Sequence, residues 1–184
     1  MSVEVEPILR RRVQPKRLEV VNLKILVIGD PGVGKTSLVR RFCSKVALAA
    51  AYTPTVGADF SVRSLPHRGK DVRVNIWDAS GSPEFVDVRN EFYKEMQGIV
   101  LVFDVTSKAT FQNLELWITE ASKYCQGNIP HVVVGTKVDS GARVVPEQLA
   151  RDWAKSKGFT YTEVSAASGK NIEVCFMDLA WKLV

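Results

Sequence analysis

The sequence predicts a three-layer α/β sandwich in which helices cover both faces of a mostly parallel sheet. Apolar runs at 23–28, 99–103 and 132–134 do not alternate with polar residues, and such runs are typical of strands buried on both faces. Segments with helical spacing of apolar residues lie between these runs. Strands that alternate with helices along a chain are joined by crossover connections, which makes them parallel neighbours in one sheet.

The remaining elements complete this pattern. Residues 72–77 alternate between apolar and polar side chains, which predicts a strand with one less buried face. A further short strand is expected over 160–164. The predicted helices cover residues 35–43, 90–96, 110–125, 146–157 and 171–183, and Pro146 and Gly158 suit the start and the end of the fourth.

Length and composition predict a single folded domain. The chain has 184 residues, of which 46% are apolar and 24% charged, close to the average for globular proteins. Its three cysteines, Cys43, Cys125 and Cys175, are odd in number, which argues against a disulfide framework and for a reducing compartment. The net charge of +5 is modest, so we expect no nucleic-acid partner.

Residues 1–22 are predicted to form a basic extension, and the folded domain is predicted to occupy 23–184. Basic residues cluster over 10–17, and this segment has no clear helical or strand period. One interpretation is a flexible, solvated tail. The alternative is a basic arm that binds an acidic protein surface or a membrane.

A phosphate-binding loop is predicted directly after the first strand. Residues 29–36, Gly-Asp-Pro-Gly-Val-Gly-Lys-Thr, fit the pattern G-x-x-x-x-G-K-[ST] between a strand and a helix. Backbone N–H groups of such a loop bind phosphate oxygens, and its glycines let the backbone approach closely. Lys35 would reach the outer phosphates, and the Thr36 hydroxyl would coordinate Mg²⁺, which prefers oxygen ligands. The candidate phosphate-binding residues are Asp30, Pro31, Gly32, Val33, Gly34, Lys35, Thr36 and Ser37.

Three further segments that follow predicted strands narrow the choice of ligand. Asp78 ends one strand, where a carboxylate can bind Mg²⁺ through a water molecule. The Asp139 carboxylate can accept both the ring N–H and the exocyclic amine of guanine, a donor pair that adenine lacks. An open α/β sheet binds its ligand at the carboxyl ends of its strands, so we predict a guanine-nucleotide site there. The candidate base-binding residues are Thr136, Lys137, Asp139, Ser165, Ala166 and Ala167.

Together these motifs resemble a small GTPase of the Ras superfamily over residues 23–184, and its Rab-like branch in particular. The resemblance implies the small G domain of the P-loop NTPases, with a mostly parallel six-stranded sheet, and it implies GTP or GDP and Mg²⁺ as cofactors. Residues 52–60, Tyr-Thr-Pro-Thr-Val-Gly-Ala-Asp-Phe, are similar to the first switch, in which Thr55 would sense Mg²⁺ and the γ-phosphate. Residues 77–81 are similar to the start of the second switch, with the Gly81 N–H facing the γ-phosphate.

A more specific resemblance follows in the second switch. The chain reads Val-Arg-Asn-Glu-Phe-Tyr-Lys over 88–94 and Gln-Gly over 97–98, with Pro83 before them. This run resembles the RJL family of Rab-like GTPases, some of whose members carry a J domain. The sequence contains no His-Pro-Asp tripeptide and its length leaves no room for a J domain, so we expect none in this chain.

The resemblance implies a GTP-dependent switch or docking protein in signalling or intracellular trafficking. An effector protein would bind the surface formed by residues 52–60 and 80–93. Arg89, Phe92 and Tyr93 are candidate contacts, and packing of Phe92 and Tyr93 on the sheet is the alternative. An exchange factor is a further expected partner.

Two departures from the family pattern predict weak catalysis. Ser82 stands where active members carry the glutamine that orients the attacking water, and its side chain is too short for that task. Gly81 and Ser82 are therefore the candidate catalytic positions of a slow hydrolase. Pro31 replaces a small loop residue, and its ring would hinder an arginine supplied by an activating protein; a tolerated loop substitution is the alternative.

Two further departures concern nucleotide affinity. Thr136 stands where most members have asparagine, a mild change because some Rho-type GTPases carry threonine there. Residues 46–51, Val-Ala-Leu-Ala-Ala-Ala, offer no aromatic side chain where the family places one against guanine. This loss predicts faster nucleotide exchange and, with slow hydrolysis, a chain that rests in the GTP state.

The sequence leaves two other functions as alternatives. The chain ends Trp-Lys-Leu-Val without a cysteine to prenylate, so we expect no lipid anchor. A membrane-cycling Rab needs an anchor, which favours, as the first alternative, a structural subunit of a larger, ciliary assembly with nucleotide as a fixed cofactor. A C-terminal tail that is missing from this sequence would explain the lack of an anchor equally well. A P-loop kinase is more distant, because no second substrate site is visible. We expect a cytoplasmic location, with a membrane periphery or a cilium or flagellum as alternatives.

Overall fold

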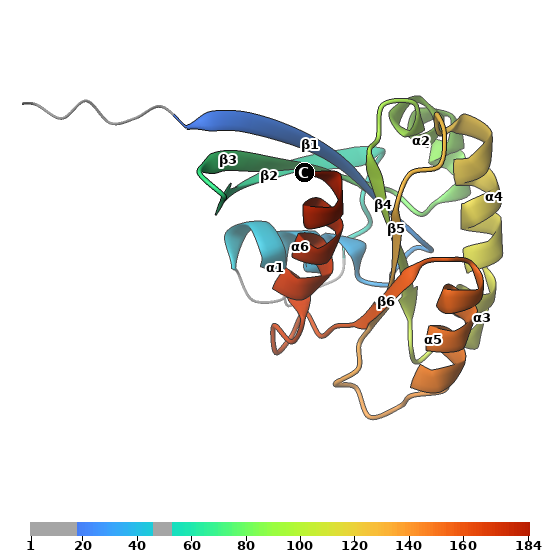
Figure 1. The fold of residues 1–184 in the computed structure, drawn as a ribbon. Coiled ribbons are helices and arrows are strands. Elements are labelled where there is room, and N and C mark those ends of the chain that lie inside the picture. Colours follow the sequence, from blue (N-terminus) through green and yellow to red (C-terminus); the bar gives the residue numbers. More distant parts are fainter. Residues whose placement is uncertain (1–17, 46–52) are drawn as a thin grey trace, which may run out of the picture.

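The computed structural model describes residues 18–45 and 53–184, and these form three layers. A six-stranded sheet runs through the centre in the order β2-β3-β1-β4-β5-β6 (Figure 1). Helices pack against both of its faces. The predicted α/β sandwich with a mostly parallel sheet is therefore confirmed.

The strands pair in parallel except at one edge. In chain order they are β1 (Glu19–Ile28), β2 (Ala58–His67), β3 (Lys70–Ala79), β4 (Gly98–Asp104), β5 (His131–Thr136) and β6 (Thr160–Glu163). β1 lies between β3 and β4, with Ile25 opposite both Ile76 and Gly98. β2 runs antiparallel to β3 and forms an edge of the sheet. Arg68 and Gly69, both with positive φ, make the tight turn that joins these two strands.

The helices cover the two faces of the sheet. They are α1 (Lys35–Ser44), α2 (Val86–Tyr93), α3 (Lys108–Gln112), α4 (Leu114–Tyr124), α5 (Glu147–Ser156) and α6 (Ile172–Leu183), with a short 3-10 turn, η1 (Pro83–Phe85), before α2. α1 and α6 pack on one face, where the Phe42 and Phe176 rings stack with centroids 4.3 Å apart. α2, α4 and α5 pack on the other face, around Tyr93 and Phe103. Every residue of β4 is buried between these layers, which explains its uninterrupted apolar run.

Two strands differ from the sequence predictions. β1 begins at Glu19, which pairs with Lys70, so the prediction that residues 19–22 belong to the extension is wrong. Its first residues are exposed and therefore give no apolar run. The sequence pattern predicts no strand at the position of β2. Most residues of this edge strand are exposed or half-buried, so they form no apolar run, and the strand contains Pro66.

Two helices also differ from the predictions. The helix expected over 90–96 lies at Val86–Tyr93, where Pro83 begins the preceding turn. The helix expected over 110–125 is divided at Asn113 into α3 and α4. Asparagine is a weak helix former, and the Asn113 side chain bonds outside the helix, to Asp30. Within residues 18–45 and 53–184, no helix has the length and apolar character needed to cross a bilayer.

Candidate functional site

The predicted site residues lie beyond the carboxyl ends of the parallel strands. Residues 29–36 follow β1 and 80–82 follow β3, whereas 136–139 and 165–167 come at the ends of β5 and β6. Parallel strands bring such turns together because all of them end at the same edge of the sheet. The Val164 N–H donates to the Gly135 carbonyl oxygen over 2.8 Å, which holds the last two turns side by side.

The loop after β1 adopts a conformation that requires its glycines. Gly29 has φ +146, and a Cβ there would lie 2.1 Å from the Val102 carbonyl oxygen. Gly34 has φ +100 and forms the N-cap of α1. Glycine alone tolerates both conditions, so the loop passes close to β4 and turns directly into α1. The N-terminus of α1 therefore faces the loop, as a phosphate-binding loop requires.

Lys35 extends back across the loop and binds its carbonyl groups. Its Nζ donates to the Gly29 oxygen over 2.7 Å and to the Asp30 oxygen over 2.9 Å, and the residue is 6% exposed. Burial lowers the pKa of Lys35 to about 8, although the nearby carboxylates of Asp78 and Asp30 oppose this shift. Lys35 is therefore a buried cation that an anionic ligand in the loop would stabilise.

Three oxygen-bearing side chains meet beside Lys35. Thr36 Oγ1 lies 2.9 Å from Thr55 Oγ1 and donates to Asp78 Oδ2 over 2.5 Å. Asp78 is buried, which raises its pKa, and its Oδ1 atom has no hydrogen-bond partner among the described residues. A buried polar atom without a partner is costly, and Mg²⁺ prefers hydroxyl and carboxylate oxygens. These three residues therefore fit a Mg²⁺ ion.

The segment after β3 packs directly on the phosphate-binding loop. A Cβ on Gly81 would lie 2.5 Å from both the Gly29 oxygen and the Pro31 nitrogen. Glycine is required here because two stretches of backbone approach so closely. Ser82 is half-buried next to it, and Pro31 is exposed. The catalytic roles of Gly81 and Ser82 stay predictions.

Thr136 joins the turn after β5 to the phosphate-binding loop. Its buried hydroxyl lies 2.5 Å from the Val33 oxygen and 2.9 Å from the Phe103 oxygen. Lys137 follows with φ +62, and its Nζ lies 2.6 Å from Asp104 Oδ2. Asp139 is exposed, so its carboxylate is accessible from solvent. The turn that carries the predicted base-binding residues is thus anchored to the loop that carries the predicted phosphate-binding residues.

The turn after β6 is held by one of its own side chains. Ser165 is buried, and its Oγ accepts a hydrogen bond from the Ser168 N–H over 3.0 Å. Ala166 is half-buried and Ala167 is exposed. Their small side chains suit a turn that a ligand approaches closely. The role of these residues in binding a base stays a prediction.

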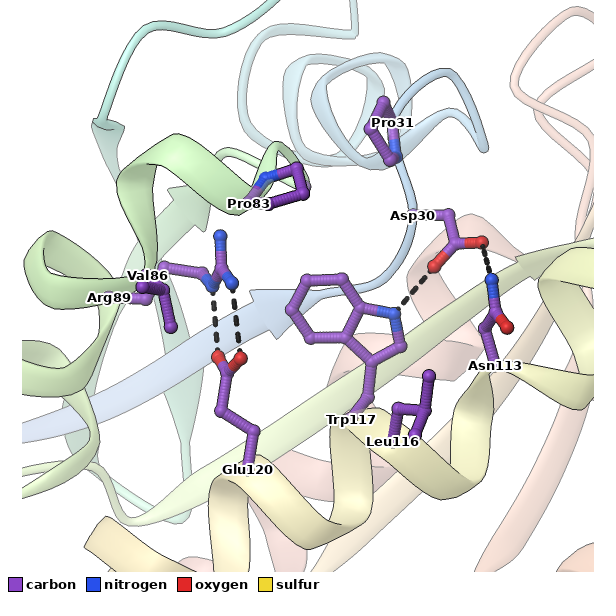
Figure 2. Close-up of a pocket in the computed structure, with 10 residues that line it drawn as sticks. Asp30, Pro31, Pro83, Val86, Arg89, Asn113, Leu116, Trp117 and Glu120 are labelled. Atoms are coloured by element: carbon purple, nitrogen blue, oxygen red, sulfur yellow. Dashed lines mark hydrogen bonds and ion pairs between the residues drawn. The ribbon is translucent and has the colours of Figure 1, made fainter.

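A cluster of side chains that the sequence pattern does not predict links the phosphate-binding loop to α4 (Figure 2). Asp30 turns its carboxylate away from the loop: Oδ1 accepts from Trp117 Nε1 and Oδ2 from Asn113 Nδ2, each over 2.7 Å. Asp30 can therefore serve the loop through its backbone only. The one sequence feature that indicates this cluster is the spacing of residues 113, 117 and 120, which places their side chains on one face of a helical segment.

Arg89 belongs to this cluster, and its predicted role as an effector contact is wrong. It is 3% exposed, and its guanidinium donates to both carboxylate oxygens of Glu120, over 2.9 and 3.1 Å (Figure 2). Tyr93 is also buried, and its hydroxyl donates to Glu120 over 2.9 Å. For Tyr93 the packing alternative is confirmed. The Arg89 and Tyr93 side chains can be buried because both donate hydrogen bonds to the carboxylate of Glu120, which belongs to α4.

A pocket of about 450 Å³ adjoins this cluster, between the phosphate-binding loop, α2 and α4. Pro31 and Pro83 line it on one side, with Val86 and Leu116 as further apolar lining residues (Figure 2). The pocket opens beside the second-switch segment, so this part of the surface is hollow rather than filled by side chains.

The described part of the predicted effector surface carries exposed apolar side chains. Val56 and Phe60 are 78% and 53% exposed, and Val88 is also exposed. Phe60 packs on Trp77 with ring centroids 5.0 Å apart. A Cβ on Gly57 would lie 4.0 Å from a Val88 methyl group, so the two switch segments meet. We call Val56, Phe60 and Val88 the apolar switch patch.

Two sequence predictions fall outside the described residues. The basic arm at 10–17 is one, and the aromatic-free segment at 46–51 is the other. Tyr52, at the start of the predicted first switch, lies outside them as well.

Comparison with known proteins agrees with this geometry. A sequence model of the Ras family matches residues 24–184. DnaJ homolog subfamily C member 27 of Danio rerio is 40% identical over 173 residues, which cover 91% of this chain and 62% of that protein. The Mus musculus protein of that name is 37% identical over 179 residues, covering 92% and 65%. Ras-related protein Rab-26 of Homo sapiens is 37% identical over 164 residues, covering 89% and 64%.

This chain spans less than two thirds of the length of these curated relatives. The similarity to Rab-26 confirms the Rab-like character of the sequence. The similarity to the DnaJ homologues confirms the predicted resemblance to the RJL family. Because the family match covers nearly all of the described residues, the chain belongs to the Ras family of small GTPases.

Proposed function

We propose that this chain binds GTP or GDP together with Mg²⁺ and acts as a nucleotide-dependent docking protein with slow GTP hydrolysis. The observation that carries the proposal is the Oδ1 atom of Asp78, which has no partner in the described part of the chain and lies beside the Thr36 and Thr55 hydroxyls. A divalent cation would give this carboxylate a partner. A polyphosphate would do the same for the buried ammonium of Lys35.

The phosphate end of the site divides these tasks among few residues. The N–H groups of the loop and the Lys35 ammonium bind phosphate oxygens. The Thr36 and Thr55 hydroxyls coordinate the metal, and Asp78 holds it through a water molecule. Mg²⁺, when bound, neutralises charge on the phosphates. Thr55 is the residue that distinguishes GTP from GDP in this proposal, because it reaches the metal from the first switch.

The base end of the site selects guanine through Asp139. Its exposed carboxylate accepts the ring N–H and the exocyclic amine, while adenine offers no such pair of donors. Thr136 takes no part in that recognition in our proposal. Its single O–H is shared between the Val33 and Phe103 carbonyl oxygens, and these contacts set the distance between the base end and the phosphate end.

Slow hydrolysis follows from the residues at the γ-phosphate end. Ser82 has no amide group and too little reach to hold a water molecule against the phosphate. Pro31 has no N–H to donate, and its exposed ring stands where an activating arginine would enter. Together these residues favour a long-lived GTP state.

The apolar switch patch is the surface that an effector protein would bind. Val56 and Phe60 belong to the first switch and Val88 to the second, so the patch depends on the arrangement of both segments. Exposed apolar side chains gathered in one place are typical of interaction sites. We expect the partner to present an apolar face to this patch.

Identification of the nucleotide that purifies with the protein tests the proposal. The purified protein is denatured, and the released small molecules are separated by chromatography. GTP would support the long-lived GTP state, whereas GDP would support binding but contradict slow hydrolysis. Absence of any nucleotide, with no uptake of fluorescent GDP in the presence of Mg²⁺, would overturn the proposal and favour a structural subunit.

A further inference from the structure

The guanidinium of Arg89 uses four hydrogen bonds to join the second switch to α4. Two go to the Glu120 carboxylate (Figure 2). The other two leave its NH1 group for the Ser80 and Ser82 carbonyl oxygens, over 2.9 and 2.8 Å. Arg89 is 3% exposed, so these bonds are shielded from water. We call Arg89 and Glu120 the α2–α4 clamp.

The bond to Ser80 fixes the direction of a neighbouring N–H group. The Ser80 carbonyl and the Gly81 N–H belong to one peptide bond, which is planar and trans, so they point in opposite directions. Because Arg89 holds the Ser80 oxygen toward α4, the Gly81 N–H points away from α4. The bond to the Ser82 oxygen fixes the residue that follows Gly81. Gly81 therefore lies between two residues whose carbonyl groups Arg89 holds, and its backbone packs closely on the phosphate-binding loop.

The clamp is itself supported by protein groups alone. Glu120 accepts a third hydrogen bond, from the Tyr93 hydroxyl. The Trp117 ring lies under the guanidinium, 4.8 Å from its central carbon, and its indole N–H donates to Asp30. All of these contacts join protein groups to one another, so none of them requires a bond to nucleotide. A ligand can shift a conformational equilibrium only by the difference in its interactions with the two states.

We propose that Arg89 is a positioning residue that holds Gly81 in one orientation whichever nucleotide is bound, so that residues 80–93 do not rearrange between the GDP and GTP states. This inference rests on the proposed binding of guanine nucleotides. The γ-phosphate would add one hydrogen bond at Gly81, whereas the clamp supplies four whose partners are all protein groups. The γ-phosphate would then be sensed by Thr55, whose side-chain hydrogen bond among the described residues is to the hydroxyl of Thr36.

Hydrogen–deuterium exchange tests this inference. Wild-type protein is loaded with GDP·Mg²⁺ or GTPγS·Mg²⁺, and exchange is compared for peptides covering 53–60 and 80–93. We expect GTPγS to slow exchange in 53–60, and exchange in 80–93 to differ by less than about twofold between nucleotides. In Glu120→Gln and Arg89→Lys, exchange in 80–93 should become about tenfold faster with GDP and stay near wild type with GTPγS.

The matched control is Glu115→Gln, an exposed glutamate of the same helix that pairs with Lys157. It should leave exchange in 80–93 unchanged with both nucleotides. Strong nucleotide dependence of 80–93 in the wild type would overturn the inference, and so would equal acceleration with both nucleotides in the clamp variants. If neither nucleotide protects peptides of the phosphate-binding loop, the proposed function fails, and the inference fails with it.

Discussion

Substitution of Gly81 by alanine tests the close contact between the second switch and the phosphate-binding loop. The backbone of Gly81 is not in the left-handed region, so alanine introduces no conformational strain of its own. The new Cβ would lie 2.5 Å from the Gly29 oxygen and the Pro31 nitrogen, closer than any real contact. Both neighbours are backbone atoms, so the 80–82 segment must move.

The size of the movement sets the size of the expected effect. Ordinary Cβ contacts begin at 3.4 Å, so the segment must retreat by about 1 Å. A displacement of this size at a reacting or binding group costs up to about 100-fold. Only the γ-phosphate meets the Gly81 N–H in our proposal. We therefore expect affinity for GTPγS to fall by about 10-fold to 100-fold, or about 1.4–2.7 kcal/mol, with little change for GDP.

Competition against fluorescent GDP measures both affinities. Gly127→Ala is the control, because Gly127 has positive φ but lies in open space, so the change adds strain without a collision. It should lower stability by about 1 kcal/mol and leave the ratio of the two affinities unchanged. Equal losses for GDP and GTPγS in Gly81→Ala, or no loss for either, would refute the reasoning.

Three further changes have defined outcomes. Asp139→Ala should lower affinity for GDP at least about 100-fold in the same competition assay, because a charge-assisted pair of hydrogen bonds is lost, while Asp152→Ala should not. In nucleotide-free protein the pKa of Lys35 is about 8, below its ordinary 10.5, so the unfolded state binds more protons between these values. The free energy of unfolding should therefore rise with pH across this interval by up to about 3 kcal/mol more than in Lys35→Met; equal slopes in urea unfolding would contradict this. Phe176→Ala removes the ring stacked on Phe42 and should cost about 3–5 kcal/mol of stability and roughly 6–20 °C in Tm.

Much of the fold follows from short-range patterns in the sequence. β4 is buried along its whole length, so its apolar run is unbroken and unambiguous. The 29–36 loop is equally clear, because its glycines are required by backbone geometry that few other residues tolerate. β2 lacks any such pattern. It is stabilised by pairing with β3, and only one of its ten residues is buried.

The clamp lies beyond prediction from one sequence for a different reason. Arg89 and Glu120 are 31 positions apart and sit on different helices. A charged residue on a short helix is normally exposed, which made Arg89 a reasonable effector contact. Burial reverses that interpretation, since a guanidinium can enter the interior only where a carboxylate and carbonyl oxygens receive it. Such partners are brought together by the packing of α2 on α4, which no local pattern records.

The two halves of the apolar switch patch should respond differently to nucleotide. Val56 adjoins Thr55, which touches the metal site through one hydroxyl contact, so its position depends on what fills that site. Val88 adjoins Arg89, whose position is fixed by hydrogen bonds to Glu120 and to the Ser80 oxygen. An effector that contacts both halves would meet one surface that is always formed and one that GTP forms. Its affinity for the GDP state would then be reduced rather than lost, which suits the docking role and the long-lived GTP state that we propose.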